Sequence, residues 1–301
     1  DWFTKLTPAP WVYDPLERHW RRAQKDDIRP GAQLVVDASQ GGYAPGDGFD
    51  PSIRTVVEPV EPEPSDPTPD DDIHIGDNSS STEYGRAVPL AEHLLDTERS
   101  ARQLCEELGL DDQGLSAAIC LAARLHDAGK AHDDFQKALH QLAPDADPNV
   151  LLAKSSTKGR LPMPGDRAGF RHELASVAML EANPHLATAH GVDADLVIYL
   201  VGAHHGRLRL GIRSLAGEPE RQILGLRFGE DIREADLGDG LIARTTRVNL
   251  DFCRLGGDGE RQSWSARATD LLEEHGPFRL AWMEAVVRIA DWRASAEGAQ
   301  R

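Results

Sequence analysis

Apolar residues recur at helical spacing in the part of the chain that follows Pro89. One apolar face is formed by Leu90, Leu94, Ala101, Leu104 and Leu108, and Gly109 is expected to end that helix. Two long loops, 143–169 and 207–240, interrupt the pattern, and 248–252 predicts a short strand. The pattern predicts a mostly α fold, a helical bundle with long loops. Further helices are expected at 115–139, 170–182, 194–205, 263–275 and 278–294, the last two separated by Gly276-Pro277.

The first 57 residues show a different pattern, which predicts a small mixed appendage. A short helical stretch is expected around Trp20, Arg21 and Arg22, and a strand at 32–36. Glycines at positions 41, 42, 46 and 48 predict turns. They do not form a phosphate-binding loop, because no Gly-Lys-Ser/Thr sequence follows them and no helix begins there.

Between residues 58 and 81 the composition shifts to Pro, Asp, Glu and Ser. Such a segment buries too little apolar surface to offset its chain entropy, so an acidic, Pro-rich linker is expected. The chain is therefore predicted to consist of an appendage (1–57), a linker (58–81) and a helical domain (82–301).

The chain is strongly acidic, with 33 basic and 50 acidic residues and a net charge of −17 when His is neutral. A protein that coats duplex DNA needs a basic footprint, so this charge argues against that class. It leaves a nuclease open, because bound divalent cations reverse the local sign of a carboxylate-rich cleft. Charge alone therefore does not decide the partner.

Cysteine usage and hydropathy bear on the compartment. The three cysteines, Cys105, Cys120 and Cys253, are far apart and form no Cys-x-x-Cys pair, which favours a reducing cytoplasm. No apolar run approaches the roughly 20 residues of a membrane helix, so no membrane partner is expected. The chain begins with Asp1 rather than Met, and we expect a fragment of a longer polypeptide or a processed chain.

The central motif is the segment 125–130, Leu-His-Asp-Ala-Gly-Lys. His126 and Asp127 are adjacent, so on a helix they point about 100° apart and can bind two sides of one ion. Lys130 follows three residues after Asp127 on the same face, and Gly129 allows another backbone to approach closely. A His-Asp pair alone is a weak signal of a metal site.

Further ligand-type residues accompany this pair along the helical domain. His93 lies on the apolar side of its predicted helix, and Asp291 lies beside Ile289 and Trp292, where an uncompensated carboxylate is costly. His132 comes six residues after His126 and is expected to point elsewhere. Seven metal-ligand candidates result, namely His93, His126, Asp127, His172, His204, His205 and Asp291.

The ordered set His…His-Asp…His…His-His…Asp resembles the HD superfamily of metal-dependent phosphohydrolases. More narrowly, it resembles the HD nuclease domain of the type I CRISPR interference helicase-nuclease, over about residues 89–295. The resemblance is strong at the motifs and thin in the two loops. The narrower likeness is carried by Gly129-Lys130, Phe135-Gln136, Arg171-His172-Glu173 with Ser176, His204-His205-Gly206 and the segment Ala-Asp-Trp-Arg-Ala-Ser at 290–295.

The resemblance implies an HD-domain helical bundle with a centre for two divalent metal ions. It places one ion on His93, His126, Asp127 and Asp291. It places the second on Asp127, His172, His204 and His205, with Asp127 as the bridge. A carboxylate can bridge two ions whereas a neutral imidazole cannot. An imidazole-rich shell favours transition metals such as Mn, Fe, Co or Ni over Mg.

The implied reaction is phosphodiester hydrolysis, in which a water activated by the ions attacks phosphorus in line with the leaving oxygen. His126 and Asp127 belong to this catalytic group, and Lys130 is expected to neutralise charge on the phosphoryl oxygens. Arg171 either contacts the phosphate or braces Glu173.

Basic loop residues adjoin the ligands and suggest a rim that guides a single strand by its phosphates. Ordinary solvated loop charges are the alternative interpretation. The nucleic-acid-binding candidates are Arg171, Arg207, Arg209 and Lys158, accompanied by Lys154, Arg160, Arg167 and Arg213.

The sequence therefore predicts a nuclease that degrades single-stranded DNA in type I CRISPR interference. The resemblance implies two partners, a superfamily 2 helicase and an RNA-guided surveillance complex. No helicase motif occurs in the chain, so the helicase is expected as a separate protein or as a missing N-terminal part. The HD domain more often precedes the helicase in this family, so the role of residues 1–57 stays open.

Two other functions remain. An HD phosphohydrolase acting on nucleotides, such as a deoxynucleoside triphosphatase or a cyclic-nucleotide phosphodiesterase, would use the same ligands. A non-catalytic adaptor with a structural metal is the third hypothesis, although a complete shell for two ions is more than a structural site requires.

Overall fold

The structure is a computed structural model. It describes residues 2–14, 19–28, 34–44, 48–57, 86–157, 159, 161–167, 169–188, 191–214, 218–254 and 262–298. The chain divides into two units, residues 1–68 and 69–301. The linker expected at 58–81 lies outside the described residues.

The first unit contains a small antiparallel sheet in the order β2-β1-β3. Its strands are β1 (Trp11–Asp14), β2 (His19–Arg22) and β3 (Leu34–Val35), and β4 (Tyr43–Ala44) pairs with β5 (Gly48–Phe49). Short 3-10 helices lie at Phe3–Lys5, Lys25–Asp27 and Ala38–Gln40. The strand expected at 32–36 is therefore present in its described part.

The helix expected around Trp20, Arg21 and Arg22 is wrong, because these residues form β2. Val12 pairs with Arg21 in the antiparallel ladder, and the Arg22 guanidinium lies 4.0 Å from the centroid of the Trp11 ring. Pairing with the neighbouring strand β1 outweighs the weak helical preference of a four-residue stretch.

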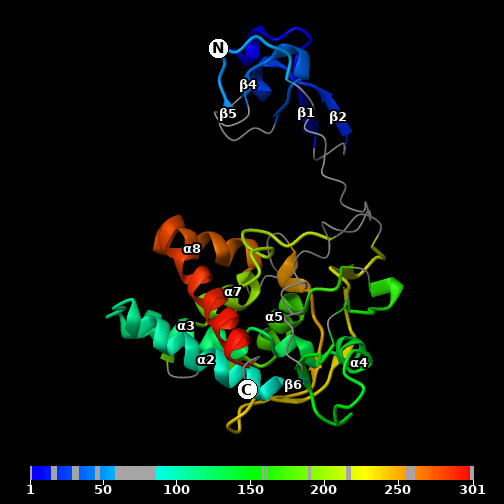
Figure 1. The fold of residues 1–301 in the computed structure, drawn as a ribbon, viewed down its shortest axis with the longest axis vertical. Helices are drawn as coiled ribbons and strands as arrows, with labels where there is room; N and C mark the ends of the chain where they lie inside the picture. Colours follow the sequence, from blue (N-terminus) through cyan, green and yellow to red (C-terminus); the bar gives the residue numbers. More distant parts are fainter. Residues whose placement is uncertain are drawn as a thin grey trace. The chain divides into compact units, whose positions relative to one another are not determined.

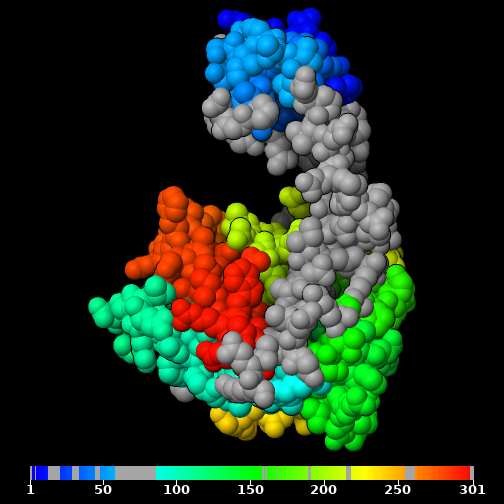
Figure 2. Space-filling view, in the orientation of Figure 1, coloured from blue at the N-terminus to red at the C-terminus, as the bar shows by residue number. Residues whose placement is uncertain are grey.

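The second unit is mostly helical, as predicted. Helix α8 packs against α2 and α3, and α7 packs against α3, α5 and α8 (Figure 1). In the space-filling view the orange and red surface of α8 adjoins the teal surface of α2 and α3 (Figure 2). The helices are α2 (Leu90–Glu107), α3 (Gln113–Leu125), α4 (Asp133–Gln141), α5 (His172–Ala182), α6 (Pro184–Ala187), α7 (Ala194–Ala203) and α8 (Trp264–Gly298).

The apolar periodicity of α2 corresponds to its buried face. Leu90, Leu94 and Leu104 are buried, whereas Leu108 is 52% exposed because it follows the end of the helix. Gly109 adopts a φ of 63°, which terminates α2 as expected. The predicted break in α8 is also present, since Gly276 has a φ of 73° and a non-helical ψ of 161°.

The single helix expected at 115–139 is wrong. Helix α3 ends at Leu125, the 3-10 helix η5 spans Ala128–Ala131, and α4 begins at Asp133. The Ser176 hydroxyl of α5 donates to the His126 carbonyl (2.8 Å) and accepts from the Gly129 amide (2.8 Å). This tertiary contact draws both groups away from a helical hydrogen-bond ladder. His126 and Asp127 therefore lie beyond the end of α3, and the angle of 100° expected between them on one helix is wrong.

The two long loops carry short strands. In the first, β7 (Leu152–Lys154) pairs with β6 (Val88–Pro89), which runs directly into α2, and a 3-10 helix spans Gly165–Arg167. The second loop, together with the residues that follow it as far as Arg247, forms the pairs β8–β9, β10–β13 and β11–β12. These strands are Gln222–Ile223 (β8), Leu226–Arg227 (β9), Asp231–Ile232 (β10), Ala235–Asp236 (β11), Ile242–Ala243 (β12) and Thr246–Arg247 (β13).

The strand expected at 248–252 is wrong. β13 ends at Arg247, and residues Asp251–Cys253 form a 3-10 helix. The Asn249 side-chain oxygen accepts from the Asp251 amide at 2.8 Å, so the side chain stabilises a turn in place of an extended strand. Among the described residues, no helix has the length and apolar character to cross a membrane.

Candidate metal centre

Residues from five helices converge at one buried position. His93 belongs to α2, His126 caps the C-terminus of α3, and His172 is the first residue of α5. His204 and His205 directly follow α7, and Asp291 lies on α8. All seven candidates are buried except His205, which is partly buried; they are His93, His126, Asp127, His172, His204, His205 and Asp291.

The two oxygens of Asp127 face different imidazoles. Oδ2 lies 3.4 Å from His93 Nε2 and 3.3 Å from His126 Nε2. Oδ1 lies 3.1 Å from His172 Nε2 and 3.9 Å from His204 Nε2. Asp127 therefore stands between two groups of nitrogen ligands.

The first group contains His93, His126 and Asp127, whose ligand atoms lie within 4.8 Å of one another. Asp291 adjoins it, because its Oδ1 lies 3.1 Å from His93 Nε2 and 3.8 Å from His126 Nε2. The Ser295 hydroxyl donates to the same oxygen at 3.2 Å and orients the carboxylate. Two carboxylates and two imidazoles thus meet in the first group.

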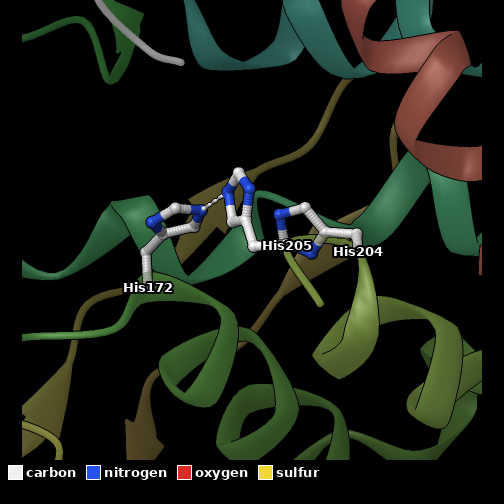
Figure 3. A group of neighbouring side chains, drawn as sticks. All are labelled: His172, His204 and His205. Atoms are coloured by element: carbon white, nitrogen blue, oxygen red, sulfur yellow. Dashed lines mark hydrogen bonds between the residues drawn. The ribbon is translucent and has the colours of Figure 1, made fainter. Parts of the chain in front are cut away.

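The second group contains His172, His204 and His205, and its ligand atoms also lie within 4.8 Å of one another (Figure 3). The Nε2 atoms of His172 and His205 approach to 3.1 Å, the contact drawn as a dashed line in Figure 3. The residues after α7 therefore present their imidazoles to the first residue of α5.

The imidazoles are oriented as metal ligands require. His126 Nδ1 donates to the Ala123 carbonyl (2.8 Å) and His204 Nδ1 donates to the Val201 carbonyl (2.6 Å), so Nε2 of each ring is the atom that would bind a cation. The Nε2 atoms of His93, His126 and His204 are buried without a hydrogen-bond partner. Buried polar atoms without partners are costly, and divalent cations at the two groups would satisfy all three. The ligand set therefore fits a metal site.

Protonation differs between the two groups. Burial lowers the pKa of His126, but the carboxylates of Asp127 and Asp291 outweigh burial and raise it to about 9. Burial, together with His126 and His172, lowers the pKa of His204 to about 3. Burial and the neighbouring His204 also hold the pKa of His205 well below its usual value. In the metal-free protein His126 thus carries a proton, whereas His204 and His205 are neutral.

The carboxylates are ionised at neutral pH. Burial raises the pKa of Asp127, but His126 and Lys130 outweigh it and hold that pKa well below its usual value. Burial likewise opposes ionisation of Asp291, and Lys154 with His126 keeps its pKa low. Both aspartates are therefore available as anionic ligands.

Lys130 is buried, with 2% of its side chain exposed. Its ammonium group lies 2.8 Å from Asp127 Oδ2 and donates to the Ala153 carbonyl at 3.3 Å. The structure thus places Lys130 inside the centre and on the carboxylate that faces both groups.

Three residues expected at the basic rim are buried instead, namely Lys154, Arg167 and Arg171. Lys154 lies 3.9 Å from Asp291 Oδ1, and its side chain is 3% exposed. Arg167 donates to Glu230 and to the Gly225 carbonyl, so it ties loops together. The short apolar run before Lys154, Leu151-Leu152-Ala153, is the signal that indicates a buried strand there. Lys158 and Arg160 lie outside the described residues.

A pocket of about 460 Å³ is lined by Arg171, Arg207, Arg209 and Arg213. Arg171 is buried, with a guanidinium nitrogen 3.9 Å from Glu173 Oε1. Arg209 pairs with Glu284 (2.9 Å), whereas Arg207 is exposed. Two residues that line the pocket are sequence neighbours of the second group: Arg171 precedes His172, and Gly206 follows His205.

His132 belongs to neither group of ligands. Its Nδ1 accepts from the Asp134 amide (3.2 Å) at the start of α4, and its Nε2 lies 3.5 Å from Glu230. His132 therefore caps the N-terminus of α4.

Comparisons with known proteins agree with the resemblance inferred from the motifs. No curated protein and no solved structure matches the chain. The family model described as "Cas3, HD domain" matches residues 78–299, which include every ligand candidate. Because this match spans most of the chain, the protein belongs to the family of Cas3 HD domains.

Proposed function

We propose that this chain is a metal-dependent nuclease that hydrolyses phosphodiester bonds of single-stranded DNA in type I CRISPR interference. Family membership implies an HD nuclease. The observation that carries the proposal is the carboxylate of Asp127, whose two oxygens face separate groups of imidazoles. A bridging carboxylate between two ligand groups is the arrangement of two-metal phosphodiester hydrolysis.

Two divalent cations are proposed, one per group. The first would bind His93, His126, Asp127 and Asp291. The second would bind Asp127 together with the three imidazoles of His172, His204 and His205. Five imidazoles and two carboxylates favour Mn, Fe, Co or Ni over Mg, which prefers oxygen ligands.

When bound, the cations supply a nucleophilic water of lowered pKa and neutralise charge on the phosphoryl oxygens. The chain's own residues prepare this chemistry. Lys130 holds the Asp127 carboxylate in place through a 2.8 Å ion pair. Its ammonium charge also compensates negative charge that develops on the phosphate, because the surroundings are buried and weakly screened.

The path of the strand is proposed to cross the arginine-lined pocket next to the second group. Arg171, Arg207, Arg209 and Arg213 line it. In a chain of net charge −17, this local excess of guanidinium groups favours phosphate contacts over a broad duplex-binding face. Phosphate contacts carry no sequence information, so cleavage without sequence preference is expected.

The family relationship also suggests the partners. We infer that the nuclease receives its strand from a superfamily 2 helicase, either a separate chain or a part of the same polypeptide, at DNA opened by an RNA-guided surveillance complex. The helicase unwinds the duplex, which explains why the nuclease itself needs only a narrow basic path.

A substrate panel tests the proposal. The purified chain is incubated with Mn²⁺ and end-labelled single-stranded DNA, the matching duplex, or a set of nucleotides including triphosphates and cyclic nucleotides. Cleavage of the single strand is expected, abolished by a chelator and restored by added Mn²⁺. Hydrolysis of nucleotides with the DNA left intact would identify a nucleotide phosphohydrolase instead. A chain that binds metal and hydrolyses neither would be an adaptor.

Metal binding is expected to strengthen as pH rises from about 6.5 to about 8.5. His126 must be neutral to bind a cation through Nε2. Its pKa of about 9 keeps it protonated in the metal-free protein over this range. Proton competition therefore falls with rising pH, by up to roughly tenfold in affinity per pH unit, and ends above the pKa. Calorimetric titration with Mn²⁺ at three pH values measures the effect, and an affinity independent of pH would contradict it.

A further inference from the structure

Each carboxylate of the centre has its own buried lysine. Lys130 lies 2.8 Å from Asp127 Oδ2, and Lys154 lies 3.9 Å from Asp291 Oδ1. The two lysine side chains are 2% and 3% exposed. A buried ammonium group is costly unless a carboxylate compensates it. Lys154 is therefore an internal countercharge rather than a surface lysine.

The fold holds Lys154 on a rigid element. It pairs with Val88 in the β6–β7 ladder, and β6 runs directly into the helix that carries His93. The Gln136 side chain donates to the carbonyls of Leu152 (2.9 Å) and Lys130 (2.7 Å) and accepts from the Leu152 amide (2.8 Å). The side-chain amide of Gln136 therefore links strand β7, which carries Lys154, to the 3-10 helix η5, which carries Lys130. These hydrogen bonds fix the backbone from which both ammonium groups reach the metal centre.

Lys154 lies beside the first group. Its partner, the Asp291 carboxylate, adjoins the imidazoles of His93 and His126, which belong to the first group. The Asp291 oxygen that Lys154 approaches is the same one that faces His93. A cation bound there meets the positive charge of Lys154 at short range, in a buried site where charges interact strongly.

We propose that Lys154 is a positioning residue that pairs with Asp291 in the metal-free protein and weakens the binding of the first cation. Coulomb repulsion between the ammonium group and the bound cation lowers the affinity of the first group, while the second group keeps its affinity. The two cations therefore bind with different affinities, and the first group becomes the exchangeable position. This inference rests on the proposed metal centre.

Calorimetric titration of the full chain with Mn²⁺ tests the inference. Lys154→Gln removes the charge and keeps much of the side-chain length. One of the two binding steps is expected to tighten by roughly tenfold or more, and the other is expected to stay unchanged. Lys154→Arg keeps the charge and should reproduce both steps of the parent chain. Lys137→Gln, a matched change at a lysine that is 71% exposed, should also leave both steps unchanged.

Two results would overturn the inference. Unchanged affinities in Lys154→Gln would show that the ammonium group does not act on the cation. Weaker Mn²⁺ binding in this variant would show that Lys154 positions the metal ligands and does not repel the cation. Thermal unfolding of the metal-free variants checks that each one folds. Lys154→Asn serves as a second uncharged variant when the Gln variant does not fold, and it must tighten the same step.

The proposed metal centre and the proposed role of Lys154 can be contradicted separately. A parent chain that binds no Mn²⁺ contradicts the metal centre itself. A parent chain that binds two Mn²⁺ ions while Lys154→Gln tightens neither leaves the proposed nuclease intact and removes only the role of Lys154.

Discussion

Asp127→Asn is expected to abolish DNA cleavage, lowering the rate by at least roughly 10³-fold, or about 4 kcal/mol of transition-state stabilisation. The amide has nearly the same shape as the carboxylate, but it carries no charge and cannot serve both ligand groups. Because each Asp127 oxygen faces a different group, the substitution weakens both cation sites at once. Single-turnover cleavage of labelled single-stranded DNA measures the rate, and Mn²⁺ titration of the same sample measures the binding stoichiometry.

Asp133→Asn is the matched control for this experiment. It makes the same chemical change six residues later, at a side chain that is 58% exposed and pairs with Arg233. Its cleavage rate and its Mn²⁺ stoichiometry should equal those of the parent. An Asp127→Asn variant that still binds two ions and cuts DNA at the parental rate would rule out Asp127 as the bridge.

Gly129→Ala is expected to destabilise the fold by about 3 kcal/mol or more. A Cβ atom at this position would lie 2.2 Å from the His172 carbonyl oxygen and 2.3 Å from the Ser176 amide nitrogen. Both atoms belong to the backbone of α5, so they cannot move aside as a flexible side chain would. Urea-induced unfolding of the metal-free chain, followed by circular dichroism, measures the loss.

Gly114→Ala provides the comparison. Gly114 lies in the first turn of α3, and its added Cβ would meet only the Asp112 side chain at 3.4 Å. Alanine favours helix over glycine, so this variant should be unchanged or more stable by up to roughly 1 kcal/mol. A loss below about 1 kcal/mol in Gly129→Ala would mean that α5 can shift away from η5.

Periodicity in the sequence was sufficient to locate most helices of the second unit. Leu90, Leu94 and Leu104 are apolar at helical spacing because one face of α2 is buried, and the Gly276-Pro277 break follows from backbone chemistry alone. Such features are local, so a single sequence contains them. His93 and Asp291 are predictable as ligands because a His or Asp among apolar neighbours is costly without a function. The other candidates follow from the motifs that resemble the HD family.

The errors arise where contacts outside a segment decide its local structure. Helix α3 stops at Leu125 because Ser176, fifty residues later, binds the His126 carbonyl. Arg21 joins a strand because Val12 pairs with it. Lys154 was assigned to an exposed rim, although its partner Asp291 lies far along the chain. The pattern of apolar residues within a short segment cannot reveal these contacts, because they form only in the folded chain.

The position of Asp291 on α8 has a consequence during protein synthesis. The first ligand, His93, emerges from the ribosome almost two hundred residues before the last. An unfinished chain lacks one carboxylate of the first group, and α8, which packs against α2 and α3, has not yet closed the core. The ligand set proposed for the first cation therefore stays incomplete until α8 has been synthesised and has packed against α2 and α3.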